Sequence, residues 1–280
     1  MRRLLYIAIF GGLLTSCQSD EVPELSAANL VVVEGWLTNI DTIQSVKLST
    51  SQSFLSDEPE LILQDAQVSI SGDNGETINF QYAEGGKYLS TRRVAGKAGV
   101  NYTLRVILAD GRAITSGSET MNTAPTIDSL GYDSYERQSE DVPNLIETVY
   151  YPVVKFQDPE AETNYYRLRV AKNDTLFTEA SEIVLINDRF FNGNAPFIEN
   201  ELTIFEFAAS DSISIELQEI SRAGYEFLRV LKAQTTSLGS TSSITPAPVS
   251  GNLRFVESDE TVLGYWGTTS IQKGGIKIIQ

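Results

Sequence analysis

The 280-residue sequence contains no histidine, a single cysteine, two methionines and two tryptophans. Without imidazole, histidine-based catalytic triads, histidine proton shuttles and the common zinc sites are excluded. Positive charge is also scarce, because 21 lysines and arginines stand against 37 aspartates and glutamates, for a net charge of −16. Nucleic-acid binding depends on contacts of lysine and arginine with phosphate, so this balance predicts no nucleic-acid partner.

The N-terminus lacks an apolar run of the length that a membrane-spanning helix needs. Arg2 and Arg3 precede an apolar stretch from Leu4 to Leu14. A helix that crosses a bilayer needs about 20 such residues. We therefore interpret residues 1–16 as a secretion signal that is removed, and not as an anchor.

The apolar stretch ends in Leu14-Thr15-Ser16-Cys17, which resembles a bacterial lipobox. The resemblance implies cleavage before Cys17, diacylation of its sulfur and acylation of the new amino terminus. Two or three acyl chains hold a protein firmly, so outer-membrane lipid is a predicted partner through acylated Cys17. Since Cys17 is the only cysteine, the mature chain would have no thiol for disulfides or catalysis. The alternative is an ordinary signal peptide beside an incidental cysteine.

An acidic pair follows the cysteine closely, in Ser19-Asp20-Glu21. This segment resembles the surface-export signal of Bacteroidota lipoproteins, which implies display on the outer face of the outer membrane. We expect residues 17–28 to form a lipidated tether and the protein to be lipid-anchored, facing the cell exterior. The alternative is that these residues are simply the polar tether of any lipoprotein.

Alternating apolar and polar residues dominate the chain from Leu30 onward. This period of two predicts strands with one buried face. Asp73-Asn74-Gly75 and Asp110-Gly111 predict tight turns between such strands. We therefore expect an antiparallel Ig-like β-sandwich over residues 29–122. The clearest alternation is in Tyr102, Leu104, Val106 and Leu108.

A polar stretch around Pro125 is the predicted boundary of a second, β-rich domain over residues 126–280. Ser221 has the side chain of a helix cap, and an amphipathic helix is expected near 221–234. The predicted fold is thus all-β, with two tandem β-sandwich domains and one helix in the second. Further strands are expected at Thr148–Phe156, Tyr165–Val170 and Leu202–Phe207.

Four segments together resemble a Bacteroidota outer-membrane lipoprotein family known as domain of unknown function 4249. The resemblance implies a surface lipoprotein, often encoded near TonB-dependent receptors, with no established enzymatic activity. It also likens the first domain to transthyretin-like modules attached to outer-membrane transporters. The segments are Val32–Asn39, Asp188–Asn194, Ile220–Phe227 and Leu263–Gly267.

Several patterns that suggest chemistry have simpler explanations. Ser270-Ile271-Gln272-Lys273 matches the Ser-x-x-Lys motif of penicillin-recognising enzymes, but it lies in a strand-like tail without their other motifs. Two acidic loops offer oxygen ligands for calcium without the regular spacing of a calcium loop. We therefore expect no catalytic residue, no metal and no cofactor. The acidic loops contain Asp57, Glu58 and Glu60, and Asp158, Glu160 and Glu162.

Aromatic residues are the best candidates for contact with a partner, because they give large contact areas at low entropic cost. Trp36 lies in an apolar strand and is expected in the core. Phe190 and Phe191 are adjacent in a predicted loop, where both cannot easily point inward. We predict a partner-binding loop that comprises Phe190, Phe191, Asn192 and Asn194.

The expected function is binding without catalysis. We expect an accessory partner of a TonB-dependent transporter that captures or gates a nutrient. One alternative is an adhesion or envelope-structural module, which would use sandwiches on a tether as well. The other is a surface hydrolase built on carboxylates, which needs a cleft lined by two or more buried acids.

Overall fold

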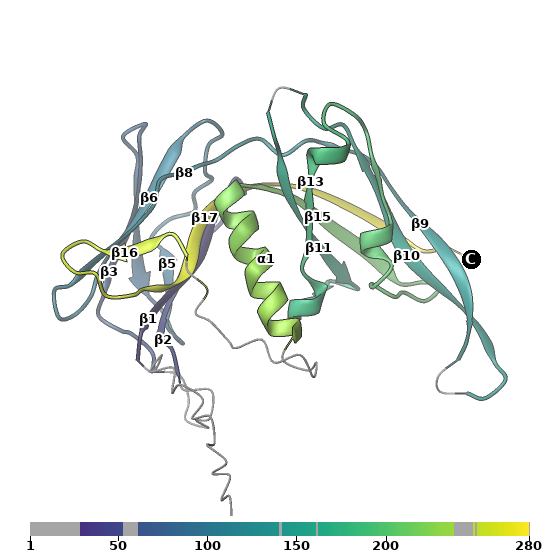
Figure 1. The fold of residues 1–280 in the computed structure, drawn as a ribbon, viewed down its shortest axis with the longest axis horizontal. Coiled ribbons are helices and arrows are strands. Elements are labelled where there is room, and N and C mark those ends of the chain that lie inside the picture. Colours follow the sequence, from purple (N-terminus) through teal and green to yellow (C-terminus); the bar gives the residue numbers. More distant parts are fainter. Residues whose placement is uncertain are drawn as a thin grey trace, which may run out of the picture.

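Two β-rich lobes lie side by side in the computed structural model, with one helix between them (Figure 1). The structure describes residues 29–52, 61–139, 142–160, 162–237, 249 and 251–279. Among these residues, no helix is long and apolar enough to cross a membrane. The predicted signal peptide, Cys17, the export segment and the tether lie outside the described residues, as do Asp57, Glu58 and Glu60.

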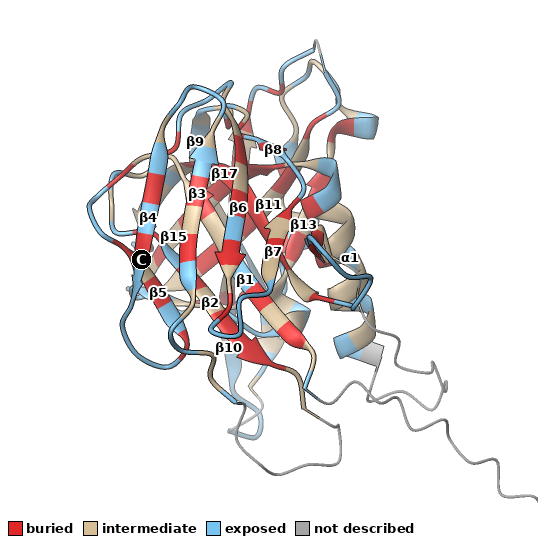
Figure 2. Cartoon of the chain, turned by 90° about the vertical axis from the view of Figure 1, so that its left-hand side faces the viewer, coloured by how far each residue is buried: buried red, intermediate tan, exposed pale blue. Residues whose placement is uncertain are grey.

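The first lobe is built from strands whose inward residues form one apolar core. Figure 2 shows buried and exposed residues alternating along its strands, as a pleated strand with one buried face requires. Tyr102, Leu104 and Val106 point inward and are fully buried, as the alternation predicts. The strands are β1 (Val31–Thr38), β2 (Ser45–Thr50), β3 (Gln67–Gly72), β4 (Thr77–Tyr82), β5 (Lys87–Ser90), β6 (Asn101–Ile107), β7 (Ala113–Ser116), β8 (Glu119–Thr120) and β16 (Leu253–Phe255).

The second lobe packs a three-stranded sheet, in the order β14-β10-β9, against strands of the larger sheet. The apolar side chains of β10, β11 and β15 meet in a second core with Phe205 and Phe207. Short 3-10 helices interrupt the strands. The elements are β9 (Ile127–Gln138), β10 (Ile146–Phe156), β11 (Tyr165–Lys172), β12 (Thr175–Leu176), η1 (Ala180–Glu182), β13 (Val184–Asn187), η2 (Asp188–Phe190), β14 (Phe197–Ile198), η3 (Asn200–Leu202) and β15 (Ser212–Ile220).

One long strand, β17 (Leu263–Lys277), belongs to both lobes (Figure 1). Its first half pairs in parallel with β1, and its second half pairs antiparallel with β15. Thr269 lies opposite Thr38 in the first pairing and opposite Ile220 in the second. Within the described residues, one sheet therefore runs through both lobes in the order β12-β11-β15-β17-β1-β2-β5-β4-β3-β6-β7-β16.

The C-terminal segment returns to the first lobe before it reaches the second. β16 pairs with β7, and Trp266 is fully buried in the first core. The predicted division into domains at 29–122 and 126–280 stays a prediction. Strand hydrogen bonds along β17 join the two predicted domains. The all-β class, the sandwich packing and the helix are confirmed.

The helix α1 (Arg222–Ser237) begins where the sequence predicts and ends a few residues later. The Ser221 hydroxyl accepts a hydrogen bond from the Gly224 amide at 3.1 Å, the contact expected of a helix cap. Lys232 donates to the carbonyl of Ile183 at 2.6 Å and ties the helix to the second lobe.

The expected strand at Leu202–Phe207 is wrong. Leu202 ends the 3-10 helix η3, and the chain then turns so that Phe205 and Phe207 enter the second core. Ile204, directly before Phe205, is 52% exposed. In this irregular segment the inward positions fall at intervals of two to three residues. Over so short a length, that spacing resembles the alternation of a strand.

Candidate functional site

The predicted partner-binding loop follows β13 and is folded around Asp188. The Asn187 side chain caps η2 by accepting from the Arg189 amide at 3.2 Å. The Asp188 carbonyl accepts from the amides of Phe191 and Asn192, each at 2.8 Å. These local bonds satisfy the backbone of a short loop without a partner strand.

Two buried carboxylates fix this loop to the second lobe. Asp188 accepts from the Asn164 amide at 2.8 Å. Asp158 is 1% exposed and accepts from the Tyr166 hydroxyl at 2.6 Å and from the Gly193 amide at 3.0 Å. Burial raises the pKa of Asp158, and these two hydrogen bonds oppose that rise. Both carboxylate oxygens of Asp158 thus accept hydrogen bonds from other protein groups.

The calcium arrangement considered for Asp158, Glu160 and Glu162 is not formed. Asp158 is turned into the protein, whereas Glu160 and Glu162 are exposed. Among the residues that the structure describes, no three histidine, cysteine or acidic side chains gather as metal ligands.

The two adjacent phenylalanines face opposite ways. Phe191 packs edge-on against Phe156 in the second core, with ring centroids 6.2 Å apart. Phe190 is 90% exposed, and the Arg189 guanidinium lies 5.5 Å from its ring centroid. The loop therefore presents one aromatic ring outward and uses the other as its anchor. Contact of Phe190 with a partner stays a prediction.

The other two predicted residues are exposed and differ in their contacts. Asn192 lines a hollow beside the loop, and the Asn194 side chain donates to the Asn192 carbonyl at 3.0 Å. The Asn194 carbonyl accepts from the Asp158 amide at 3.0 Å. Asn192 is therefore placed to meet a ligand, while Asn194 holds the loop in shape.

The hollow lies between the loop and the first turns of α1, and we call it the loop–helix pocket. Its volume is about 380 Å³. The rings of Tyr165 and Tyr225 lie 5.1 Å apart, and the Asn187 amide donates to the Tyr225 hydroxyl at 3.1 Å. Other residues that line the pocket are Thr163, Asp188, Arg189, Asn192, Arg222 and Glu226.

The opposite side of α1 rests on an aromatic junction with the first lobe. Tyr265 lies between Trp36 and Phe227, with ring centroids 5.4 Å and 5.1 Å away. Its hydroxyl donates to the buried Glu119 carboxylate at 2.6 Å and lies 3.1 Å from the Ser221 hydroxyl. The four segments that carry the family resemblance thus meet around the beginning of α1.

Some of these residues could not be identified from the sequence. Glu119 and Glu219 are buried acids, but in the sequence they resemble ordinary outward-facing polar residues of strands. No sequence signal distinguishes them, because the alternation assigns a face only where apolar residues mark it. The two residues of the Ser-x-x-Lys motif have separate partners: Ser270 is buried beside the Ala124 amide, while Lys273 pairs with Glu216 at 2.8 Å.

No curated protein matches the chain. A family model described as "Domain of unknown function (DUF4249)" matches residues 18–274. This match includes all four segments around α1 and nearly the whole chain. The chain therefore belongs to the family described as domain of unknown function 4249.

Proposed function

We propose that this protein is a lipid-anchored, outward-facing protein of the outer membrane that binds and does not catalyse. Its partner in this proposal is a TonB-dependent transporter, which it assists in nutrient uptake. The lipobox ending at Cys17 and the acidic segment Ser19-Asp20-Glu21 support the location. Acyl chains at Cys17 would keep the protein beside a receptor in the same membrane.

The exposure of Phe190 on a loop held by hydrogen bonds is the observation that carries the binding role. An exposed phenylalanine on a loose loop would lose conformational freedom on binding, which weakens association. Here the bonds to Asp158 and Asp188 order the loop before any partner arrives. Aromatic residues at the centre of an interface commonly supply much of its binding energy.

The neighbouring pocket gives the same surface a polar part. Arg189, Asn192 and Arg222 supply hydrogen-bond donors next to the exposed ring. A central aromatic residue with polar groups around it is the usual composition of a protein interface. We infer that the loop and the beginning of α1 form the contact surface for the transporter.

Purification of the native lipoprotein in mild detergent tests the proposal. We expect a β-barrel receptor, identified by mass spectrometry, to accompany the wild-type protein. Phe190→Ala is expected to reduce the recovered receptor at least about tenfold, the effect of losing one interface anchor. Phe197→Ala is the matched control, since Phe197 is 65% exposed on β14.

Two results would count against the proposal. Reproducible absence of a β-barrel receptor from the wild-type preparation would contradict the transporter role. Recovery of an adhesin or a secretion component instead would favour an envelope-structural module.

Cys17→Ser is expected to release the protein from the membrane, which fractionation of the cells would detect.

A further inference from the structure

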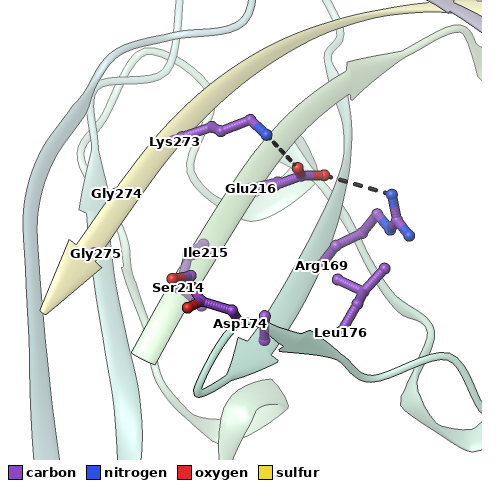
Figure 3. Close-up of a pocket in the computed structure, with 10 residues that line it drawn as sticks. Arg169, Asp174, Leu176, Ser214, Ile215, Glu216, Lys273, Gly274 and Gly275 are labelled. Carbon is purple, nitrogen blue, oxygen red and sulfur yellow. Dashed lines mark hydrogen bonds and ion pairs between the residues drawn. The ribbon is translucent and has the colours of Figure 1, made fainter. Parts of the chain in front are cut away.

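A second hollow, on the face of the β11, β15 and β17 strands, is lined by two cations and two carboxylates (Figure 3). The strand register places Arg169 opposite Glu216, and Glu216 opposite Lys273. Arg169 and Lys273 reach the Glu216 carboxylate at 3.5 Å and 2.8 Å. The Gln218 amide also donates to Glu216 at 2.9 Å. Arg169 and Lys273 therefore share one carboxylate, which also accepts a hydrogen bond from Gln218.

Arg167 lies two residues from Arg169, on the same face of β11. Its Nε is buried without a hydrogen-bond partner, and it forms no ion pair with any residue that the structure describes. Burial, helped by the neighbouring Arg169 and opposed by Glu216, lowers the pKa of Arg167 to about 10. A buried guanidinium nitrogen without a partner is costly, and an anion beside it would relieve that cost.

The hollow has room for a small molecule. Its volume is about 520 Å³, within the usual range of ligand pockets. Ala171 and Leu176 give it an apolar side, and Gly274 and Gly275 leave backbone without side chains. A ligand that fits must therefore combine a negative charge with a non-polar body.

The charge of the hollow suits a monoanion. Arg169 and Lys273 line it together with the carboxylates of Glu216 and Asp174, which balance their charge. Arg167, beside Arg169 on β11 but outside the lining, adds one positive charge nearby. A dianion would gain from the same cations, but these two carboxylates would repel it more strongly. Carboxylates also match the planar fork of arginine.

We propose that this face binds a small organic acid. Its carboxylate would lie against Arg169 and Lys273, with Arg167 as the third cation, and its non-polar body against Ala171 and Leu176. This site is separate from the loop that carries Phe190 and does not depend on the proposed partner.

Calorimetric titration of the full-length protein, in a non-ionic detergent, tests this site with three probes. Hexanoate has the charge and the apolar body, hexanol has only the body, and inorganic phosphate has only the charge. We expect saturable binding of hexanoate that is at least about tenfold tighter than binding of either other probe. Equal binding of hexanoate and hexanol, or tighter binding of phosphate, would overturn the assignment.

Substitutions distinguish binding at this hollow from unspecific attraction of hexanoate to positive charges elsewhere on the protein. Arg167→Met and Arg169→Gln are each expected to weaken hexanoate binding at least about tenfold. Glu216→Gln should strengthen it several-fold, because it removes the competing carboxylate and frees both cations. Arg105→Gln, an exposed arginine on β6 in the first lobe, is the control and should bind like the wild type.

The variants also supply the decisive negative result. Circular dichroism establishes that each one folds, and Arg169→Gln remains informative if Arg167→Met does not. Unchanged hexanoate binding in the folded variants, or weaker binding in Glu216→Gln, would show that the hollow is not the site. Loss of the receptor in Phe190→Ala with hexanoate binding intact would separate this site from the proposed transporter surface.

Discussion

The hydroxyl of Tyr265 donates to the carboxylate of Glu119 at 2.6 Å, inside the junction that joins the first lobe to α1. The Asn252 side chain donates to the same oxygen of Glu119, whereas the other oxygen is buried without a partner. Burial and the adjacent carboxylate raise the pKa of Tyr265, so the phenol keeps its proton. The Tyr265 hydroxyl is therefore one of the two donors that Glu119, a buried acid with one unpartnered oxygen, has at this junction.

Tyr265→Phe is expected to destabilise the protein by about 1–3 kcal/mol, the cost of leaving a buried charged acceptor without one of its donors. The ring contacts with Trp36 and Phe227 stay in place, so the change isolates the hydroxyl. Urea unfolding followed by tryptophan fluorescence measures the effect. Tyr82→Phe removes the hydroxyl of an exposed tyrosine and should leave stability nearly unchanged. Similar losses in both variants would contradict the prediction.

Glu219 makes the stability of the protein depend on pH. It is 2% exposed, and burial raises its pKa from 4.5 to about 8, against the hydrogen bond from Asn122 and with the help of Glu162. Between these values the folded state holds a proton that the unfolded state releases. Stability therefore falls as pH rises, by about 1.4 kcal/mol per pH unit for this group.

Glu219→Gln removes this dependence, since the amide is neutral in both states. Relative to the wild type, the variant should gain about 2–3 kcal/mol between pH 5 and pH 7. Urea unfolding at several pH values gives this difference. Glu201→Gln, at an exposed position of η3, is the control. A constant difference between Glu219→Gln and the wild type across this range would refute the assignment.

Gly224→Ala should destabilise the protein although alanine is the better helix former. A Cβ at position 224 would lie 2.9 Å from Cη2 of Trp36, closer than the packed ring can accept. Such overpacking costs about 1–3 kcal/mol. Thermal unfolding measures it, and adding Trp36→Phe should restore part of the loss. Gly131→Ala, where nothing lies within 4 Å of the new Cβ, is the control.

Local features of this fold could be predicted from the sequence because they depend on near neighbours. The alternation through Tyr102 and Leu104 fixes which side of β6 is buried, and Ser221 marks the start of α1. The pairing of β17 with β1 and then β15 could not be predicted. A strand pattern shows that a segment pairs, but it does not show with which strand.

The candidate sites show the same limit. The opposed directions of Phe190 and Phe191 follow from the short spacing of two aromatics in a loop. The gathering of Arg169, Glu216 and Lys273 depends on the register of three strands that are distant in the sequence. Each one alone resembles an ordinary polar strand residue, so only the assembled sheet reveals the charged hollow.

The sharing of β17 determines how the protein would carry mechanical load. A pull on the N-terminal side of β1 acts along the strand, and seven consecutive residue pairs with β17 resist it in shear. Bonds loaded in shear yield together, whereas the bonds of a hairpin pulled apart from its end break one after another. The same strand passes the load to β15 without a flexible joint. A force on the chain before β1 would therefore move both lobes together.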